Sequence, residues 1–302
     1  MVAQEGELVK TIIKNAYAKV NLALDVLGKR PDGYHEVSMV MQNLSLHDTL
    51  TFEADYADDV DIKLTCNRND IPLNENNLVY KAILLMFDKY NIKAHINVHI
   101  DKQIPVEAGM AGGSTDCAAC FHAINELFEI EADLDTLMKL GVTLGADVPY
   151  CIMGCTALSE GIGEVLTPVT PLTDCYVLVA KPPISVSTGM VYKSLDAKEI
   201  CEHPDVAGMV GALERGSIQD VAEHMANVLE SVTVELHPEI EILKDIMKEQ
   251  GALNAIMSGS GPTVFGLYED KAAADKAAAY IGDKGLSTEI YVTKPVSGGA
   301  EK

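Results

Sequence analysis

The sequence has no tryptophan, and aromatic residues make up only 5% of its 302 residues. It also lacks any apolar run near the roughly 20 residues that a membrane-spanning helix needs. Basic residues are few, because 23 Lys and Arg stand against 45 Asp and Glu, for a formal net charge of −22. Nucleic acids and acidic membranes are polyanions, so this charge disfavours both as partners. A nucleotide could still bind in a locally positive cleft.

A disulfide framework is also missing. Seven cysteines are too few for a chain of this size, and their odd number argues the same way. Cys117 and Cys120 form a CxxC pair, but no second pair follows at zinc spacing, so buried reduced thiols are favoured over a metal or redox site. The N-terminus is acidic and lacks the basic and apolar regions of a signal peptide. We therefore expect a cytoplasmic protein.

Length and patterning predict an α+β protein of two domains, residues 1–166 and 167–302, joined near the segment 168–174. Alternating residues predict a strand over 94–100 and a hairpin over 48–64, and an apolar run predicts a buried strand over 175–180. Helical spacing is found over 78–87, 117–128, 135–144, 189–195, 218–229, 238–250 and 272–281.

Small residues dominate the stretch from Pro105 to Asp116, which reads Pro-Val-Glu-Ala-Gly-Met-Ala-Gly-Gly-Ser-Thr-Asp. Its last three residues are typical N-caps and precede the predicted helix over 117–128. A loop of small residues that leads into a helix presents free N–H groups at the positive end of the helix dipole. The stretch therefore predicts an anion site, most simply for phosphate, with an ordinary glycine-rich turn as the alternative.

Two well-known phosphate loops do not fit this stretch. A Walker loop needs a lysine directly before the Ser or Thr, and Gly113 stands before Ser114. A dinucleotide fingerprint opens with Gly-x-Gly, which Gly109-Met-Ala-Gly-Gly lacks. These differences argue against a P-loop NTPase and against a hydride-transfer enzyme.

Five other polar residues stand out, although each also has an ordinary explanation. Lys19 and Asn21 lie on one face of an alternating strand, which a solvated edge would also explain. Tyr34 and His35 follow the turn 28–33, where they could face a ligand or solvent. Asp147 is an isolated acid in an apolar run, so it must be hydrogen-bonded, cap a helix or take part in chemistry.

Together these segments resemble the galactokinase–homoserine kinase–mevalonate kinase (GHMP) superfamily. The strand Ala16-Tyr-Ala-Lys-Val-Asn-Leu22, the glycine stretch and the turn Ser258-Gly-Ser-Gly261 match its three motifs in order. Within it, the chain is most similar to the kinases that phosphorylate a cytidine diphosphate-linked methylerythritol in the non-mevalonate pathway of isoprenoid (terpenoid) synthesis. Asp32-Gly-Tyr-His35 is the element that other members lack, and Leu144-Gly-Ala-Asp-Val-Pro149 completes the pattern. The resemblance extends from about residue 14 to 292.

The resemblance implies roles for the matching residues. Asp147 is implied as the base near the substrate hydroxyl, and Lys19 as the cation that keeps it ionised and neutralises the transferred phosphoryl group. The implied ATP-binding residues are Asn77, Lys102, Pro105, Ala108, Gly109, Met110, Ala111, Gly112, Gly113, Ser114 and Thr115. The implied substrate-binding residues are Asn21, Tyr34, His35, Thr188, Tyr192, Gly259, Ser260 and Gly261, with cytosine stacked on Tyr34 and read by His35.

The resemblance also implies the fold, the cofactor and the partners. We expect an N-terminal ATP-binding domain like ribosomal protein S5, a C-terminal ferredoxin-like substrate domain and an active site between them. ATP with Mg²⁺ is implied, the metal being carried mainly by the phosphates, and no protein side chain is identified as its ligand. Both a monomer and a homodimer are open. The rival functions are another GHMP kinase, for homoserine or mevalonate, and a non-catalytic nucleotide sensor.

Overall fold

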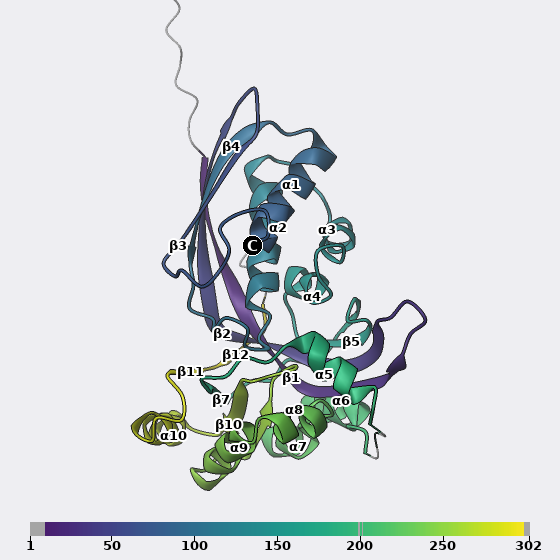
Figure 1. Ribbon diagram of the computed structural model, residues 1–302, viewed down its shortest axis with the longest axis vertical. Coiled ribbons are helices and arrows are strands. Elements are labelled where there is room, and N and C mark those ends of the chain that lie inside the picture. Colours follow the sequence, from purple (N-terminus) through teal and green to yellow (C-terminus); the bar gives the residue numbers. More distant parts are fainter. Residues whose placement is uncertain (1–9, 199, 201, 299–302) are drawn as a thin grey trace, which may run out of the picture.

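The computed structural model describes residues 10–198, 200 and 202–298. The first residues, on which the expectation about a signal peptide rests, lie outside this part of the chain. Two sheets with their helices form an upper and a lower part, as Figure 1 shows. No helix in the described residues is long and apolar enough to cross a membrane.

Within the described residues, the first sheet has eight strands and is built around one long hairpin. β1 (Lys10–Lys29) pairs antiparallel with β2 (His35–Tyr56), and both run the length of the upper part and along its junction with the lower part in Figure 1. The central order is β3-β4-β2-β1-β8, from β3 (Asp61–Cys66) to β8 (Ala226–Asn227), with β4 (Ala94–Asp101) in between. Three short strands complete the sheet. β5 (Ala157–Gly161) and β12 (Pro295–Val296) pair with the N-terminal half of β2, and β6 (Val165–Pro168) pairs with β5.

Four helices cover one face of this sheet: α1 (Leu78–Tyr90), α2 (Gly112–Leu127), α3 (Leu134–Gly141) and α4 (Val148–Met153). The apolar face of α2 lies in the middle of the core, where Cys117, Phe121 and Ile124 are fully buried. Because β1 packs on helices at one side and on the lower part at the other, residues 18–24 are buried on both of its faces. A solvated edge, the ordinary explanation for Lys19 and Asn21, is therefore excluded.

The second sheet consists of β7 (Tyr176–Lys181), β9 (Asn254–Met257), β10 (Val264–Tyr268) and β11 (Glu289–Thr293). All its pairs are antiparallel in the order β11-β7-β10-β9, which numbered within this sheet is the ferredoxin-like order 4-1-3-2. The helices α9 (Glu239–Glu249) and α10 (Lys271–Asp283) pack on it. The remaining helices surround the junction with the first sheet: α5 (Thr188–Leu195), α6 (Val206–Arg215), α7 (Ile218–His224) and α8 (Glu230–Leu236).

The structure confirms the α+β class and corrects three local predictions, one of them the helix over 218–229, which ends at His224 and is followed by β8. The hairpin over 48–64 is wrong: β2 continues unbroken to Tyr56, and β3 pairs in parallel with β4, which lies between them. Alternation identifies a strand but not its partner, so the local pattern could not reveal this insertion. The helix predicted from residue 117 begins at Gly112, capped by Ala111 in the left-handed region without a side-chain bond. Ser114, Thr115 and Asp116 therefore lie within the helix instead of capping it.

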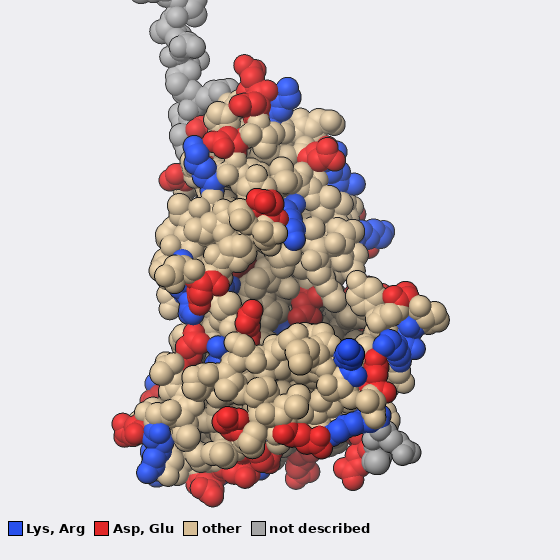
Figure 2. All heavy atoms as spheres, viewed as in Figure 1, with Lys and Arg blue, Asp and Glu red and all other residues tan. Residues whose placement is uncertain are grey.

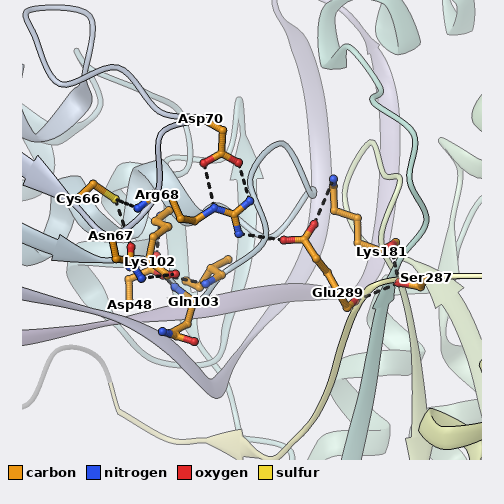
Figure 3. A network of polar contacts seen from close by, with 11 residues as sticks. Asp48, Cys66, Asn67, Arg68, Asp70, Lys102, Gln103, Lys181, Ser287 and Glu289 are labelled. Atoms are coloured by element: carbon orange, nitrogen blue, oxygen red, sulfur yellow. Dashed lines mark hydrogen bonds and ion pairs between the residues drawn. The ribbon is translucent and has the colours of Figure 1, made fainter. Parts of the chain in front are cut away.

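Polar contacts join the two parts near the chain segment between β3 and α1. Arg68 makes two hydrogen bonds to the Asp70 carboxylate and one, of 3.0 Å, to Glu289 on β11. Glu289 also lies 3.5 Å from Lys181 on β7, and Figure 3 shows the whole network. The division of the chain at residue 166 stays a prediction; β6 spans that point, and β8 and β12 return to the first sheet.

Gln42 on β2 provides a test of how the C-terminal segment is attached. Its buried amide donates to the Val296 carbonyl and accepts from the Thr156 hydroxyl and the Leu172 N–H. Gln42→Met keeps the size but leaves these groups unpaired, so we expect a loss of about 1–3 kcal/mol of unfolding free energy in urea. The matched control is Gln219→Met on the surface of α7, which should change it by less than about 0.5 kcal/mol. Equal losses of unfolding free energy in the two variants would show that the hydrogen bonds of the buried Gln42 amide do not hold the C-terminal segment in place.

Candidate active site

A cavity of about 1000 Å³ opens between the two parts of the molecule. Figure 2 shows the surface hollowed at this junction. Its wall contains most of the residues predicted for a site: Lys19, Asn21, Tyr34, His35, Asn77, Lys102, Pro105, Ala108, Gly109, Ala111, Gly112, Gly113, Ser114, Asp147, Thr188, Tyr192, Gly259 and Ser260. The structure therefore brings together segments that are far apart in the sequence.

Three predicted residues do not line the cavity. The Met110 side chain is buried in the core on the far side of β1, although its carbonyl accepts the Lys19 backbone N–H at 3.2 Å. Thr115 is buried on the inner side of α2. Gly261 lies behind the turn, where an added Cβ would meet the Met257 sulfur. These three residues shape the wall from behind.

Lys19 and Asp147 face each other at the centre of the cavity. Lys19 is buried, with 4% of the residue exposed. Its ammonium donates to Asn21 Oδ1 at 2.9 Å and to the Gly109 carbonyl at 3.4 Å, and lies 3.6 Å from Asp147 Oδ2. Irregularities in the β1–β2 register on both sides of this segment aim the two polar side chains of β1 toward the cavity. Asp147 immediately precedes α4, makes no capping bond with its side chain and stays one-third exposed. A carboxylate held next to an ammonium but open to the cavity can accept a proton from a bound ligand.

The glycine stretch and the turn 258–261 touch each other directly. Ser258 Oγ donates to the Gly109 carbonyl at 3.0 Å, and Gly109 has a φ of +70°. A Cβ at Gly109 would lie 2.2 Å from the Ser258 carbonyl oxygen, so only glycine fits here. The turn is fixed in its place by Asn227, whose amide donates to the Met257 and Gly259 carbonyls at 2.8 Å.

The N-terminus of α2 points its free N–H groups at the cavity. Gly112, Gly113 and Ser114 form the exposed side of its first turn and line the wall. The absence of side chains at two of these positions leaves the backbone accessible to an anion. This geometry meets the requirements of an anion site, and the assignment of the stretch to phosphate stays a prediction.

Behind this helix start lies a buried charged triad. Lys102 Nζ is 2.5 Å from Asp48 Oδ2 and 2.6 Å from Asp116 Oδ2, and Figure 3 shows it beside Asp48. Burial raises the pKa of Asp116 well above its usual range, and the charge of Asp48 acts in the same direction. Burial opposes the charge of Lys102, but the two carboxylates outweigh it and raise the pKa of this lysine. The triad anchors α2 to the sheet, and Lys102 still reaches the cavity wall.

The opposite end of the cavity is formed by the tip of the β1–β2 hairpin and by α5. Tyr34 is 57% exposed, whereas the rings of His35 and Tyr192 lie 4.7 Å apart. Burial raises the pKa of Tyr192 to about 12, so its hydroxyl stays protonated. The hydroxyl oxygens of Thr188 and Ser260 lie 2.8 Å apart and connect α5 to the glycine turn.

Sequence reasoning missed several residues of the wall. Lys29, Lys193 and Asp196 line the end of the cavity near His35, and Glu107 lines the cavity within the glycine stretch. Ile71 and Pro72 form an apolar patch beside Asn77, whose side chain caps α1. Lys29 lies in the turn that flanks the Tyr34 motif, which is a signal that could have indicated it. Glu107 belongs to the glycine stretch itself, and the other residues carry no local pattern.

Neither a thiol site nor a metal cluster competes with this cavity in the described part of the chain. No three His, Cys, Asp or Glu side chains come together there as a metal site. Burial raises the pKa of the Cys117 and Cys120 thiols, so they remain protonated and unreactive. Cys117 and Cys120 lie on the buried face of α2 and belong to the hydrophobic core.

Comparisons with known proteins agree with this arrangement. The family model "GHMP kinases N terminal domain" matches residues 77–155, and "GHMP kinases C terminal" matches residues 209–286. Together they span 79 + 78 = 157 of the 302 residues. The fold and the site thus define a GHMP kinase.

Curated relatives narrow the class. The chain is 53% identical to the 4-diphosphocytidyl-2-C-methyl-D-erythritol kinase of Lachnoclostridium phytofermentans over 87% of this chain and 89% of the relative. It is 47% identical to the kinase of the same name from Lachnospira eligens, over 94% of this chain and 98% of that protein. The chain therefore belongs to the 4-diphosphocytidyl-2-C-methyl-D-erythritol kinase family.

Solved structures show the same fold over the whole chain. A crystal structure of 4-(cytidine 5'-diphospho)-2C-methyl-D-erythritol kinase matches with a TM-score of 0.80 and 30% identity, covering 95% of this chain and 100% of that one. The homoserine kinase of Cytophaga hutchinsonii matches with a TM-score of 0.79 at 19% identity, covering 100% of this chain and 99% of its own. At that identity the second match shows the fold alone. The two-domain GHMP architecture predicted from the sequence is confirmed.

Gly109 gives a test of the contact between the glycine stretch and the turn. Gly109→Ala places a methyl group against the Ser258 carbonyl at a positive φ, so we expect a loss of about 1–3 kcal/mol of unfolding free energy or more. Gly113→Ala is the matched control, because its Cβ would meet only Leu78 at 3.8 Å and alanine favours a helix. Urea unfolding of both variants measures the difference. Equal stability of the two would show that the contact is not needed.

Proposed function

We propose that this protein transfers the γ-phosphoryl group of ATP to the 2-hydroxyl of 4-diphosphocytidyl-2-C-methyl-D-erythritol, a step of the non-mevalonate pathway to isoprenoid precursors. The observation that carries the proposal is the Lys19–Asp147 pair, with 3.6 Å between Nζ and Oδ2, facing the glycine stretch inside one cavity. The names of the relatives supply the substrate. Transfer is direct and in line, without a phosphoenzyme.

Asp147 acts as the base in this reaction. The proton of the acceptor hydroxyl moves to the Asp147 carboxylate while the hydroxyl oxygen bonds to the γ-phosphorus. The bond from the γ-phosphorus to the bridging oxygen breaks, and ADP leaves. The one-third exposure of Asp147 supports this role, because a ligand in the cavity can reach its side chain.

Lys19 supplies positive charge beside the phosphoryl group during its transfer. Buried ammonium groups act in a water-poor site, where they stabilise a developing negative charge more strongly than in solution. Asn21 and the Gly109 carbonyl hold Lys19 in position, so it need not reorganise during transfer. Asn21 itself contacts the substrate beside Asp147.

The ATP phosphates bind along residues 105–115, at the N-terminus of α2, and the adenosine end extends toward Asn77 and Lys102. A bound Mg²⁺ would supply positive charge that offsets the charge of the phosphates. The wall offers single oxygen donors such as Ser114, Glu107 and Asp147, so the residues present fit a metal held mainly by phosphate. Cytosine binds at the other end between Tyr34 and Tyr192, where His35 reads its edge, while Thr188 and residues 259–261 close the site.

The rest of the proposal concerns the whole protein. Residues 1–166 form the ATP-binding domain and residues 167–302 the substrate-binding domain. The protein acts in the cytoplasm on small molecules, as a monomer or a homodimer. Nucleic acids and membranes are not its partners, in keeping with the charge of −22.

A substrate panel tests the function. With ATP and Mg²⁺, ADP release should be fastest with the cytidine diphosphate-linked methylerythritol and at background with homoserine and mevalonate. Faster turnover of homoserine or mevalonate would replace the proposed substrate by that of another GHMP kinase. ATP binding without ADP release on any alcohol would favour a nucleotide sensor.

Asp147→Asn tests the mechanism on the same assay. Removal of a general base lowers kcat by about 10²–10⁴-fold, while the affinity for ATP should change little. Asp135→Asn is the matched control, because Asp135 lies exposed on α3, where it pairs with Lys139. A kcat near that of the unmodified protein in Asp147→Asn would remove Asp147 from the role of base.

A further inference from the structure

The imidazole of His35 is held by a carboxylate that the sequence did not indicate. His35 Nε2 lies 2.7 Å from Asp196 Oδ1, and the other oxygen of Asp196 pairs with Lys29. Asp196 directly follows α5, the helix that carries Thr188 and Tyr192. The contact therefore joins the tip of the β1–β2 hairpin to the lower part of the molecule at the cytosine end of the cavity.

The ionised form of Asp196 determines which ring nitrogen of His35 carries the proton. The hydrogen bonds from Lys29 and then from His35 lower the pKa of Asp196, so it is a carboxylate at neutral pH. A carboxylate only accepts hydrogen bonds, so Nε2 must donate to it. In the neutral imidazole the other nitrogen, Nδ1, is then an acceptor. Among the contacts of the described residues, none occupies Nδ1.

An acceptor at Nδ1 distinguishes cytosine from uracil and thymine. Cytosine carries an amino group at C4, which donates a hydrogen bond, whereas the oxygen at the same position of thymine, and of uracil, only accepts one. His35 lines the cavity and lies against Tyr192, with 4.7 Å between the ring centroids. The ring is thus placed beside the surface on which the base stacks.

We propose that Asp196 is a specificity-determining residue that fixes the Nε2-protonated tautomer of His35 and so makes the site select a cytidine over a uridine diphosphate group. The inference rests on the proposed function, which puts the pyrimidine at this end of the cavity. Asp196 is a positioning residue: it acts through His35 and does not itself touch the base.

Lys29 has a different part in the same cluster. Its ammonium pairs with the Asp196 carboxylate and so helps to hold the hairpin against α5, but it makes no hydrogen bond to the imidazole of His35. Removing Lys29 therefore weakens the tie between the hairpin and α5 and leaves the His35–Asp196 bond in place. This makes Lys29→Met a control that separates the tie from the choice of tautomer.

The test measures the binding of CDP and UDP by calorimetry. A non-hydrolysable ATP analogue at saturation keeps both nucleotides out of the phosphate loop. We expect the original protein to bind CDP about tenfold to a hundredfold more tightly than UDP, which is the effect of one buried acceptor left unpaired. Asp196→Asn can hydrogen-bond either tautomer, so the CDP/UDP ratio should fall close to one. Asp196→Glu should restore much of the ratio, and Lys29→Met should weaken both ligands without changing it.

Each other outcome overturns the inference. A ratio kept in Asp196→Asn would make Asp196 only a tie between hairpin and helix, and a ratio lost equally in Lys29→Met would assign selectivity to that tie. Equal binding of CDP and UDP by the original protein would show that no selection exists. The proposed function fails separately, if the protein does not phosphorylate the cytidine-linked alcohol at all. Thermal unfolding of each variant checks that the fold is kept.

Discussion

The buried ammonium group of Lys19 is the constraint on which the rest of the site depends. A charge that is almost removed from water must be surrounded by oxygen atoms. Here they come from Asn21 on the same strand, from the Gly109 carbonyl and from Asp147 before α4. Gly109 in turn contacts the turn 258–261 of the second sheet. One lysine therefore aligns four segments, and the cavity between the two parts of the molecule follows from their meeting.

The charge of the whole protein makes this local arrangement necessary. A chain with a net charge of −22 repels the two anionic ligands that we propose for it. The wall itself holds four lysines and four carboxylates, so net charge alone does not attract phosphate. In the proposed binding mode the free N–H groups at the start of α2 supply the attraction. Behind them, Lys102 pairs with the Asp116 carboxylate.

Much of the fold could be predicted from short-range patterns in the sequence, whereas most of the site residues could be predicted only through the resemblance to the GHMP superfamily. Helices such as α1 and α10 have helical apolar spacing, and the glycine stretch leaves its backbone open in a way that points to an anion. What could not be predicted depends on contacts between distant residues. The insertion of β4 beside β2 is one case, and the meeting of Asp196 with His35, 161 positions apart, is another. The burial of Lys102 between two aspartates has no local signal either, since its partners lie 54 and 14 positions away.

The central claim is that Lys19 and Asp147 meet the transferred phosphoryl group from the side of the acceptor hydroxyl. A crystal structure of the protein with a non-hydrolysable ATP analogue and the cytidine diphosphate-linked methylerythritol tests it most directly. The account predicts the acceptor hydroxyl at about 2.6–3.2 Å from the Asp147 carboxylate, in line with the γ-phosphate, with Lys19 beside both. An acceptor hydroxyl out of reach of Asp147, with another group at its proton, would contradict the account.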